Sequence, residues 1–314
     1  MVEVSIVIVN YNEPELLKEC VASLIRETKE ISYEVIVVDN GSTVGNVEEC
    51  LAAFPSVILI KNKNNMGFAA ANNIGLKCAN GKYLLFLNND TLFTHNAVKH
   101  VHDFTGKFDT PVFASCQLIN ADRSKQDTVT KFPKVWNGFT ENFFLYKLFL
   151  KSPIFNKYYQ NYINLTKPSE VDVIRGAFMF CSADAVRQLN GFDERFFFYS
   201  EETDLCYRFK KNGGKIFFLP EVSIIHYGGV TTDKNLWFKF KNQSIGKVQF
   251  YQKHFKGLQF VVALIFHFAG LFMRGILFTL SGFITLRKSL IVKGYYFFKQ
   301  MTVYPKNNFK SSKS

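Results

Sequence analysis

The fold of this chain is decided by residues 4–12, which read VSIVIVNYN. The run from Val4 to Val9 is almost wholly apolar and β-branched, which predicts a strand that is buried on both faces. Residues 13–26 follow with apolar side chains at helical spacing and with Pro14 at the opening, which predicts a helix. A buried strand that leads directly into a helix is the first half of a βαβ unit.

The same alternation continues through the first ninety residues. Further strands are expected at residues 34–38, 57–61 and 83–87, with helices at 47–53 and 68–77 between them. Strands separated by helices of this length predict an α/β fold with a parallel, doubly wound sheet. The turn after the first strand reads NYNEP and contains no glycine, so neither a dinucleotide-binding fingerprint nor a P-loop is present there.

The strict alternation ends near residue 111. Downstream strands are expected at 112–119, 172–181, 215–219 and 222–226, with helices at 183–189 and 201–211. Residues 130–167 are rich in aromatic and basic side chains, and we expect them to form an excursion over the sheet. We therefore expect a catalytic domain at 1–235, with a nucleotide-binding half at 1–110 and an acceptor half at 111–235, followed by a helical extension at 236–314.

Polar residues follow each of the first four predicted strands, at 10–12, 39–42, 62–67 and 88–90. In an open α/β sheet, ligands bind outside the carboxyl ends of the strands. The same residue types also serve turn geometry alone, which is the purely structural alternative. Four polar loops at one edge of one sheet favour a binding site.

Two groups of acids are candidates for chemistry. Asp90 closes the fourth polar loop, and without a Gly-rich loop a bound diphosphate needs another counter-charge, such as a divalent cation held by oxygen ligands. The alternative is that Asp90 caps the next helix. Glu201, Glu202 and Asp204 open a helix after the aromatic run 196–199, either as a partly buried cluster or as ordinary helix-start acids. A lone histidine such as His226 usually has a structural role. A functional role for His226 is supported only if it lies near Asp90.

Several segments together resemble one family. They read VSIVIVNYN at 4–12, VIVVDNGS at 35–42, NMGFAAANN at 65–73, LLFLNND at 84–90, RGAF at 175–178, GFDERFF at 191–197, EETDLCYR at 201–208 and IHYG at 225–228. In this order the chain resembles the family-2 nucleotide-sugar glycosyltransferases of the GT-A fold, especially bacterial rhamnosyltransferase-like enzymes of cell-surface polysaccharide assembly. That resemblance implies a Rossmann-like mixed sheet flanked by helices.

The resemblance also implies a donor site and a metal site. Asp39 would hydrogen-bond the pyrimidine base of a UDP- or dTDP-sugar, and the residues around the donor would be Asn10, Tyr11, Asn12, Asn65, Gly67, Asn72, Asn88 and Asn89. The triplet 88–90 matches the family's D-x-D motif with Asn88 in place of the first acid. Asp90 and His226 would hold Mg²⁺ or Mn²⁺.

The catalytic base implied by the resemblance belongs to the acidic helix start. The pair Glu201-Glu202 matches the family's E-D pair, whose second member takes the proton of the acceptor hydroxyl, so Glu202 is the expected base. Glu201 and Asp204 stay open for the same role. Direct displacement by that hydroxyl inverts the anomeric configuration. The donor sugar, the acceptor and the linkage are not encoded in these motifs.

The charge of the chain is unevenly spread. The net charge is +12, yet residues 1–120 contain 9 Lys or Arg and 13 Asp or Glu, whereas from residue 234 onward there are 14 Lys or Arg and no acid. Residues 258–283 are strongly apolar but include Arg274, which is costly inside a bilayer. We therefore expect one or two helices that lie in an anionic membrane interface, and a short membrane-spanning anchor stays open as the other arrangement. The alternative is a buried bundle helix or a dimer contact.

The start of the sequence and the expected membrane contact together predict the cellular location of the protein. No basic segment or cleavage site precedes the first strand, which predicts no signal peptide and a location at the cytoplasmic face of the cell membrane. The acceptor is expected to be a glycan or a polyprenyl-diphosphate-linked sugar. The six scattered cysteines, without any C-x-x-C pair, are expected to be buried thiols rather than disulfides or zinc ligands.

Two other classes of protein fit less well. The sequence of a sugar nucleotidyltransferase is expected to contain a Gly-rich first loop followed by a basic residue. This chain has neither feature. A nucleic-acid binder, which the pI of 9.3 would allow, interleaves basic and aromatic residues on a structured face. The long apolar run favours lipid, and no nucleic-acid partner is expected.

Overall fold

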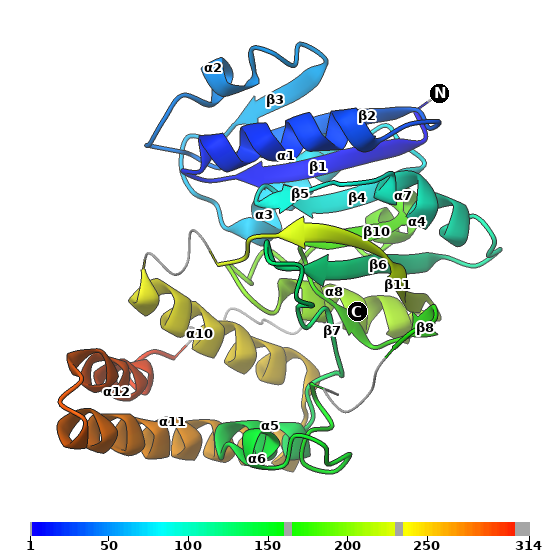
Figure 1. Cartoon of the computed structure of the whole chain (residues 1–314). Helices are drawn as coiled ribbons and strands as arrows, with labels where there is room; N and C mark the ends of the chain where they lie inside the picture. The colour runs from blue at the N-terminus through cyan, green and yellow to red at the C-terminus, as the bar shows by residue number, and fades with distance from the viewer. Residues whose placement is uncertain (1, 160–164, 230–234, 305–314) are drawn as a thin grey trace. The chain divides into compact units, whose positions relative to one another are not determined.

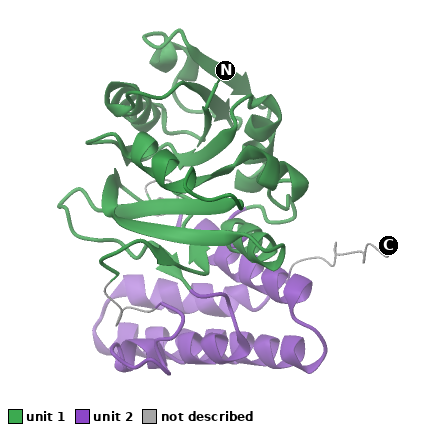
Figure 2. Cartoon of the chain, turned by 90° about the vertical axis from the view of Figure 1, so that its right-hand side faces the viewer, with its two compact units in different colours: residues 1–130, 164–197, 201–231 green, residues 131–163, 198–200, 232–314 purple. Residues whose placement is uncertain are grey.

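The computed structural model describes residues 2–159, 165–229 and 235–304. The chain forms two compact units, coloured separately in Figure 2: residues 1–130, 164–197 and 201–231 form the first, and residues 131–163, 198–200 and 232–314 the second. The grouping differs from the expected division at residue 235, because residues 131–163 belong with the C-terminal helices. The functional boundary at 235 stays a prediction. Residues 305–314 lie outside the described part of the chain.

The first unit is built on a mixed sheet whose strands run in the order β3-β2-β1-β4-β10-β6-β11-β5, with β8 beside β11. The four parallel strands at one side are β3 (Val57–Lys61), β2 (Tyr33–Asp39), β1 (Val4–Asn10) and β4 (Tyr83–Asn88). Their register sets Asn10 opposite Asp39 and Val9 opposite Asn88. The polar loops that follow β1, β2 and β4 therefore meet at one edge, as the sequence predicted.

The other side of the sheet is mixed. It comprises β10 (Phe178–Ser182), β6 (Val112–Ile119), β11 (Lys215–His226), β5 (Thr91–Leu92) and β8 (Ser169–Glu170). Strand β10 is antiparallel to β4 and β6, β11 is parallel to β6, and both β5 and β8 are antiparallel to β11. A separate pair joins β7 (Val129–Thr130) and β9 (Val173–Ile174).

Two strand predictions need correction. The strand expected at 172–181 is divided into β9 and β10, with Arg175–Ala177 between them. The two strands expected at 215–219 and 222–226 form one strand, β11, whose register shifts between Leu219 and Ser223. Pro220 lies at this shift, and a proline has no N–H to donate to the ladder, so the pairing is interrupted without ending the strand.

Helices cover both faces of this sheet (Figure 1). They are α1 (Pro14–Glu27), α2 (Val47–Leu51), α3 (Phe68–Cys78), α4 (Ala97–Thr105), α7 (Ala183–Gln188) and α8 (Glu201–Lys211). Alternate residues of β1 serve the two faces: Ile6 packs into the cluster that includes Leu24 of α1, whereas Val7 faces α3. A Cβ on Gly75 would lie 2.3 Å from Val7 Cγ1, so only glycine lets α3 approach β1 this closely.

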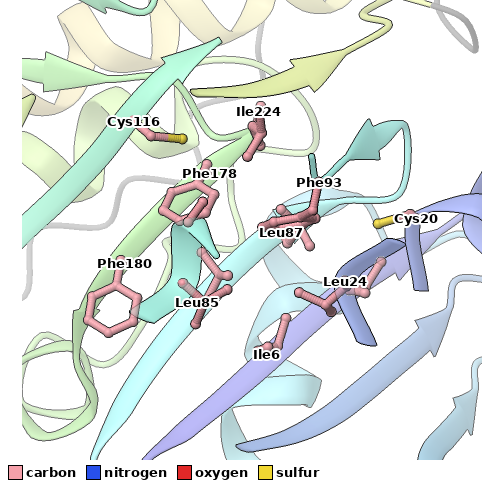
Figure 3. Packing of buried hydrophobic residues seen from close by; sticks show 14 of the residues in the cluster. Ile6, Cys20, Leu24, Leu85, Leu87, Phe93, Cys116, Phe178, Phe180 and Ile224 are labelled. Carbon is pink, nitrogen blue, oxygen red and sulfur yellow. The ribbon is translucent and has the colours of Figure 1, made fainter. Parts of the chain in front are cut away.

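The main core lies between α1, α4 and one face of the sheet. Figure 3 shows Phe178 and Phe180 of β10 beside Leu85 and Leu87 of β4. All six cysteines are free, and all except Cys78 are buried, as expected for thiols that act as small apolar side chains. Burial raises the pKa of Cys20 to about 12, so that thiol stays neutral.

The second unit is helical in its described part. Its helices are α5 (Val135–Asn142), α6 (Leu145–Leu148), α10 (Leu236–His254), α11 (Leu258–Ile284) and α12 (Lys288–Gln300). Among the described residues, α11 is the one helix long and apolar enough to cross a membrane. The apolar run expected at 258–283 is therefore a single helix.

We expect the Ile6→Ala variant to lose about 2–5 kcal/mol of unfolding free energy, because Ile6 is fully buried and its removal leaves a cavity. Ile58→Ala is the matched control: Ile58 is 41% exposed on edge strand β3, and we expect a loss below about 1 kcal/mol. Urea denaturation followed by circular dichroism measures both. Equal losses would contradict the assignment of Ile6 to the core.

Candidate active site

The ends of β1 and β2 are joined by a network of buried polar side chains. Asn10 is fully buried, and its Nδ2 donates to Asp39 Oδ1 at 3.2 Å and to Ser42 Oγ at 3.3 Å. Its Oδ1 accepts from Asn89 Nδ2 at 2.8 Å. The Ser42 hydroxyl donates to the same Asp39 oxygen. Asp39 and Asn89, both predicted donor-site residues, are thus fixed through Asn10.

The turn after β1 is bound to the loop after β2. Asn12 has a left-handed backbone with φ of 58°, which asparagine tolerates better than most residues. Its Oδ1 accepts from the backbone nitrogens of Thr43 and Val44 at 2.7 and 3.1 Å. Asn12 therefore shapes this loop, and the neighbouring Tyr11 is partly exposed beside it.

The loop before α3 is held by a second amide network. Asn40 Nδ2 donates to Asn65 Oδ1 at 3.0 Å and to the Gly67 carbonyl at 3.2 Å. Gly67 has φ of 87°, and a Cβ there would lie 2.6 Å from the Phe197 carbonyl oxygen, so glycine is required. Asn72 lies further along α3, where it is buried and donates to the Phe68 carbonyl. Asn65 and Gly67 lie at the predicted edge, whereas Asn72 is enclosed in the helix packing.

Asp90 and His226 are brought together by strand pairing. Strand β5 follows Asp90 directly and pairs antiparallel with the end of β11, with Thr91 opposite His226. Asp90 Oδ1 lies 3.4 Å from His226 Nε2, and Asp90 Oδ2 accepts from the Gly228 nitrogen at 3.1 Å. The condition set by the sequence for a role of His226, that it lies beside Asp90, is met.

The orientation of His226 is fixed by Gln126, a residue that the sequence analysis did not single out. Gln126 Nε2 donates to the His226 carbonyl at 2.6 Å and to Asn120 Oδ1 at 2.7 Å. Its Oε1 therefore faces His226 Nδ1, at 2.8 Å, as an acceptor. In a neutral imidazole this acceptor places the proton on Nδ1, and Nε2 then lies 3.4 Å both from Asn88 Nδ2, from which it can accept, and from Asp90 Oδ1.

The atoms beside His226 Nε2 suit a divalent cation. Asn88 Oδ1 and Asp90 Oδ1 are both buried and have no hydrogen-bond partner. Buried oxygens without hydrogen-bond donors are typical of a metal site when they lie next to one ring nitrogen of a histidine. The other ring nitrogen is then usually held by a hydrogen bond, as Gln126 holds Nδ1 here. Among the residues that the structure describes, no group of three or more His, Cys, Asp or Glu side chains could hold a metal. The chain thus offers a partial ligand set, which substrate phosphates commonly complete.

The three acids of α8 occupy different environments. Glu201 is buried, and its Oε2 has no hydrogen-bond partner. Burial, and then the charge of Glu202, raise the pKa of Glu201 well above the ordinary value. Glu202 is partly exposed, and its Cβ lies 3.7 Å from the position a Cβ would take on Gly176. The next residue after Gly176 is Ala177, whose carbonyl accepts from the Asn88 nitrogen at 3.1 Å. Through Gly176 and Ala177, Glu202 therefore lies at the same sheet edge as Asn88 and Asp90.

Asp204 is engaged in a buried ion pair. It is fully buried, and its Oδ2 accepts from Arg208 Nε at 2.7 Å. The other guanidinium nitrogens of Arg208 donate to the carbonyls of Leu189 and Gly191, each at 2.8 Å. The pair therefore fastens α8 to the loop after α7. Arg208 is partly buried in these contacts rather than placed as a cation for phosphates.

Asn73 is a second residue that the sequence analysis did not assign. Its Nδ2 donates to the Phe192 carbonyl and to Glu194 Oε1, and its Oδ1 accepts from the Phe192 nitrogen. It fixes the loop that leads into the acidic helix. The sequence feature that could have identified Asn73 is the pair Asn72-Asn73 inside a predicted helix. Asparagine is unfavourable there unless its side chain has a specific partner.

The raised pKa of Glu201 predicts how stability depends on pH. The folded chain holds the Glu201 proton above pH 4.5 while the unfolded chain releases it, so stability falls as pH rises from 4.5 toward the folded pKa. Glu201→Gln mimics the protonated carboxyl. We expect its unfolding free energy, relative to the natural chain, to increase over this range in urea titrations, with exposed Glu49→Gln as the control. A difference that does not vary with pH would contradict the assignment.

Comparisons with known proteins identify the family and the fold. The family model "Glycosyl transferase family 2" matches residues 5–186. Rhamnosyltransferase WbbL of Escherichia coli K12 is 28% identical over 236 residues, which cover 71% of this chain and 83% of the relative. The N-acetylglucosaminyl-diphospho-decaprenol L-rhamnosyltransferase of Mycobacterium tuberculosis is 24% identical over 243 residues, covering 73% of this chain and 78% of that protein.

Two solved structures share the fold. One is the mannosyltransferase PcManGT from Pyrobaculum calidifontis in complex with GDP-Man and Mn²⁺, with a TM-score of 0.54 and 16% identity over 96% of this chain and 86% of that chain. The other is GalNAc-T7 with UDP, GalNAc and Mn²⁺, with a TM-score of 0.51 and 17% identity over 72% and 44% of the two chains. The GT-A architecture expected from the sequence is confirmed. The chain belongs to glycosyl transferase family 2.

Proposed function

We propose that this glycosyltransferase moves a sugar from a nucleoside-diphosphate donor to a glycan or lipid-linked acceptor, with inversion at the anomeric carbon and with a divalent cation. The observation that carries the proposal is the convergence of Asn88, Asp90 and His226: Asp90 Oδ1 lies 3.4 Å from His226 Nε2, and the buried oxygens Asp90 Oδ1 and Asn88 Oδ1 have no hydrogen-bond partner. Buried oxygens without donors beside an imidazole suit a bound divalent cation.

The donor nucleotide would occupy the edge formed by the loops after β1, β2 and β4. Asp39 is held as an acceptor by Asn10 and Ser42, which suits recognition of an N–H on a pyrimidine base. The remaining residues proposed to line the donor are Tyr11, Asn12, Asn65, Gly67, Asn72, Asn88 and Asn89. Asn72 is buried, donates to the Phe68 carbonyl, and would support this edge from within α3.

Asp90 and His226 would hold the cation, Mg²⁺ or Mn²⁺, with Asn88 beside them. When bound, the cation stabilises the negative charge that develops on the leaving nucleoside diphosphate. The two solved structures of similar fold are complexes with Mn²⁺ and a nucleotide or nucleotide sugar, which supports this role. Gln126 would keep the lone pair of His226 Nε2 directed at the site.

Glu202 is the proposed base. A base must be ionised and must reach the acceptor hydroxyl. The raised pKa of Glu201 favours its neutral form, and Asp204 is paired with Arg208, so these two acids suit the role less well. Glu202 would take the hydroxyl proton as the oxygen attacks the anomeric carbon from the face opposite the leaving group.

The names of two relatives support a substrate class. Both are rhamnosyltransferases, and the mycobacterial protein is named for a decaprenol-linked acceptor. We therefore propose a deoxyhexose such as rhamnose as the sugar, a polyprenyl-diphosphate-linked acceptor and work at the cytoplasmic face of the cell membrane. The basic, acid-free sequence from residue 234 onward supports an anionic membrane partner rather than a nucleic acid, because it surrounds a long apolar helix.

We expect Asp90→Ala to weaken the binding of UDP and dTDP about tenfold or more in the presence of Mn²⁺, because the cation loses a charged ligand. Isothermal titration calorimetry with and without Mn²⁺ measures this. Asp184→Ala is the control, since Asp184 is 84% exposed on the surface of α7. Metal-dependent binding that survives in Asp90→Ala would remove Asp90 from the site.

A second variant tests the metal site without removing a ligand. We expect Gln126→Leu to weaken Mn²⁺ binding in the presence of UDP by about 10–100-fold, because the imidazole loses the acceptor that fixes its proton. Electron paramagnetic resonance of free Mn²⁺ gives the affinity. Gln126→Glu retains an acceptor for Nδ1–H but loses the two bonds donated by Gln126 Nε2, so it should recover part of the binding. Equal loss in both variants would indicate a role in loop structure alone.

We expect Glu202→Gln to bind donor nucleotide with natural affinity and to transfer sugar about 10²–10⁴-fold more slowly, because an amide cannot accept the hydroxyl proton. Release of nucleoside diphosphate from UDP- and dTDP-sugars in the presence of a lipid-linked acceptor measures turnover. Glu201→Gln and Asp204→Asn are assayed beside it. Normal turnover by Glu202→Gln would transfer the role to one of those two acids.

A further inference from the structure

Helix α11 of the second unit presents its small and polar side chains to the other helices. Gly270, Gly275 and Gly282 are buried where a Cβ would lie 2.4, 2.7 and 2.5 Å from Asn142 of α5, Phe298 and Ile291 of α12, respectively. Figure 1 shows α12 beside one half of α11 and α5 beside the other. The glycines allow both neighbours to approach the helix closely.

The polar groups of α11 are held on the same buried side. His267 is 3% exposed, and its Nε2 lies 2.8 Å from Ser244 Oγ of α10. Arg274 Nη2 donates to the Glu141 carbonyl at 2.5 Å. Lys247 of α10 binds the Glu141 carboxylate at 2.7 Å. The centre of α11 is therefore fastened by polar contacts to two other helices.

The opposite side of α11 is apolar and exposed. It carries a stripe that follows helical spacing: Leu258, Val261, Ile265, Phe272, Ile276, Leu280 and Phe283, each 38–77% exposed. A helix on the surface of a water-soluble domain has the reverse arrangement, with its apolar side inward. An exposed apolar stripe of this length marks an interaction surface.

The neighbours of α11 argue against a spanning orientation. The helix is long enough to cross a bilayer. Its central polar contacts, however, are with α5 and α10, and α10 includes Lys239, Lys241, Lys247 and Lys253. A spanning α11 would draw these cations toward the hydrocarbon, where each costs about 2.5–3.5 kcal/mol on insertion scales. A helix that lies along the surface buries only the outward stripe.

Charge at the two ends of the stripe indicates which surface it meets. Lys256 precedes α11, Arg287 and Lys288 follow it, and all three are exposed. No Asp or Glu occurs from residue 234 to the end of the sequence. An apolar stripe flanked by cations suits acyl chains beneath anionic headgroups.

We infer that α11 lies parallel to an anionic lipid bilayer, with the stripe from Leu258 to Phe283 buried among the acyl chains and with Arg274 and His267 turned toward α5 and α10. This surface is separate from the candidate active site in sequence and in the residues that form it. The inference does not depend on glycosyl transfer, because lipid binding requires neither donor nor acceptor.

Vesicle flotation of the full chain tests the surface. We expect binding to vesicles of phosphatidylglycerol and phosphatidylcholine in equal parts, and much weaker binding to phosphatidylcholine alone. The triple variant Phe272→Ser, Ile276→Ser and Leu280→Ser should lose about tenfold or more in affinity, because three apolar side chains no longer enter the lipid. Val44→Ser, at a residue that is 58% exposed in the first unit, is the control.

Two outcomes of this experiment would overturn the inference. One is equal binding by the triple variant, with circular dichroism showing that both proteins are folded. The other is a stable dimer in the absence of vesicles that the triple substitution dissociates in sedimentation analysis, because the stripe would then belong to a second copy of the chain.

Depth measurements separate lying from spanning. Spin labels are placed singly at Val261→Cys, Phe272→Cys and Phe283→Cys in a Cys78→Ser background, since Cys78 is the exposed one among the six native thiols. We expect similar, shallow depths at all three positions by oxygen and nickel accessibility. A label at 272 near the bilayer centre with shallow labels at 261 and 283 would show a spanning helix and overturn the inference.

Discussion

The antiparallel pairing of the two-residue strand β5 with the end of β11 is the contact on which the candidate metal site depends. It places Thr91 opposite His226, and the residue before Thr91 is Asp90. Because strand register advances residue by residue, a slip of one position would turn either side chain to the other face of the sheet. The backbone bond from Tyr227 to the Asp90 carbonyl and the bond from Gly228 to the Asp90 carboxylate hold this register.

A polar site inside an α/β core requires that its buried groups be satisfied, and most of them are. Asn10, Asn40 and Asn73 each make several side-chain hydrogen bonds, and each fixes a loop rather than facing solvent. An unsatisfied buried polar group costs about 1–3 kcal/mol, so the few orphaned atoms are informative. Within the candidate site these are Asn88 Oδ1, Asp90 Oδ1 and Glu201 Oε2; further orphaned atoms lie elsewhere, among them His267 Nδ1 and Arg274 Nε of the second unit.

In the second unit, polar and charged side chains of a long apolar helix pack against the neighbouring helices. Its longest helix contains Arg274 and His267, and each is paired inside the unit instead of facing the exterior. Burial alone would raise the pKa of Glu141, but the charges of Lys247 and Arg274 lower it below the ordinary value, so that carboxylate stays ionised between two cations. Breaking such a buried pair leaves an uncompensated charge and is strongly destabilising. The outward face of α11 is apolar because Arg274 and His267 both lie on the side of the helix that contacts α5 and α10.

The sequence by itself determined the parallel half of the sheet and its polar edge. Buried β-branched runs such as 4–9 and 34–38 have no other stable use than a strand covered on both faces, and the loops after them must then meet at one edge. The helix at 201–211 was also predicted with its correct ends, because its acids and cations follow the helix dipole. The GT-A fold and the family followed from the order of short motifs, which depends on local sequence.

Only the tertiary structure decided what the individual side chains do. In the folded chain Glu201 and Asp204 are buried, Asp204 is paired with Arg208 of the same helix, and Glu202 is partly exposed. The roles of Gln126 and Asn73 depend on contacts across long sequence separations, and neither lies in a motif. Periodicity reports the burial of a segment, but hydrogen bonds are directional and short, so their partners are fixed only when distant strands and loops are assembled.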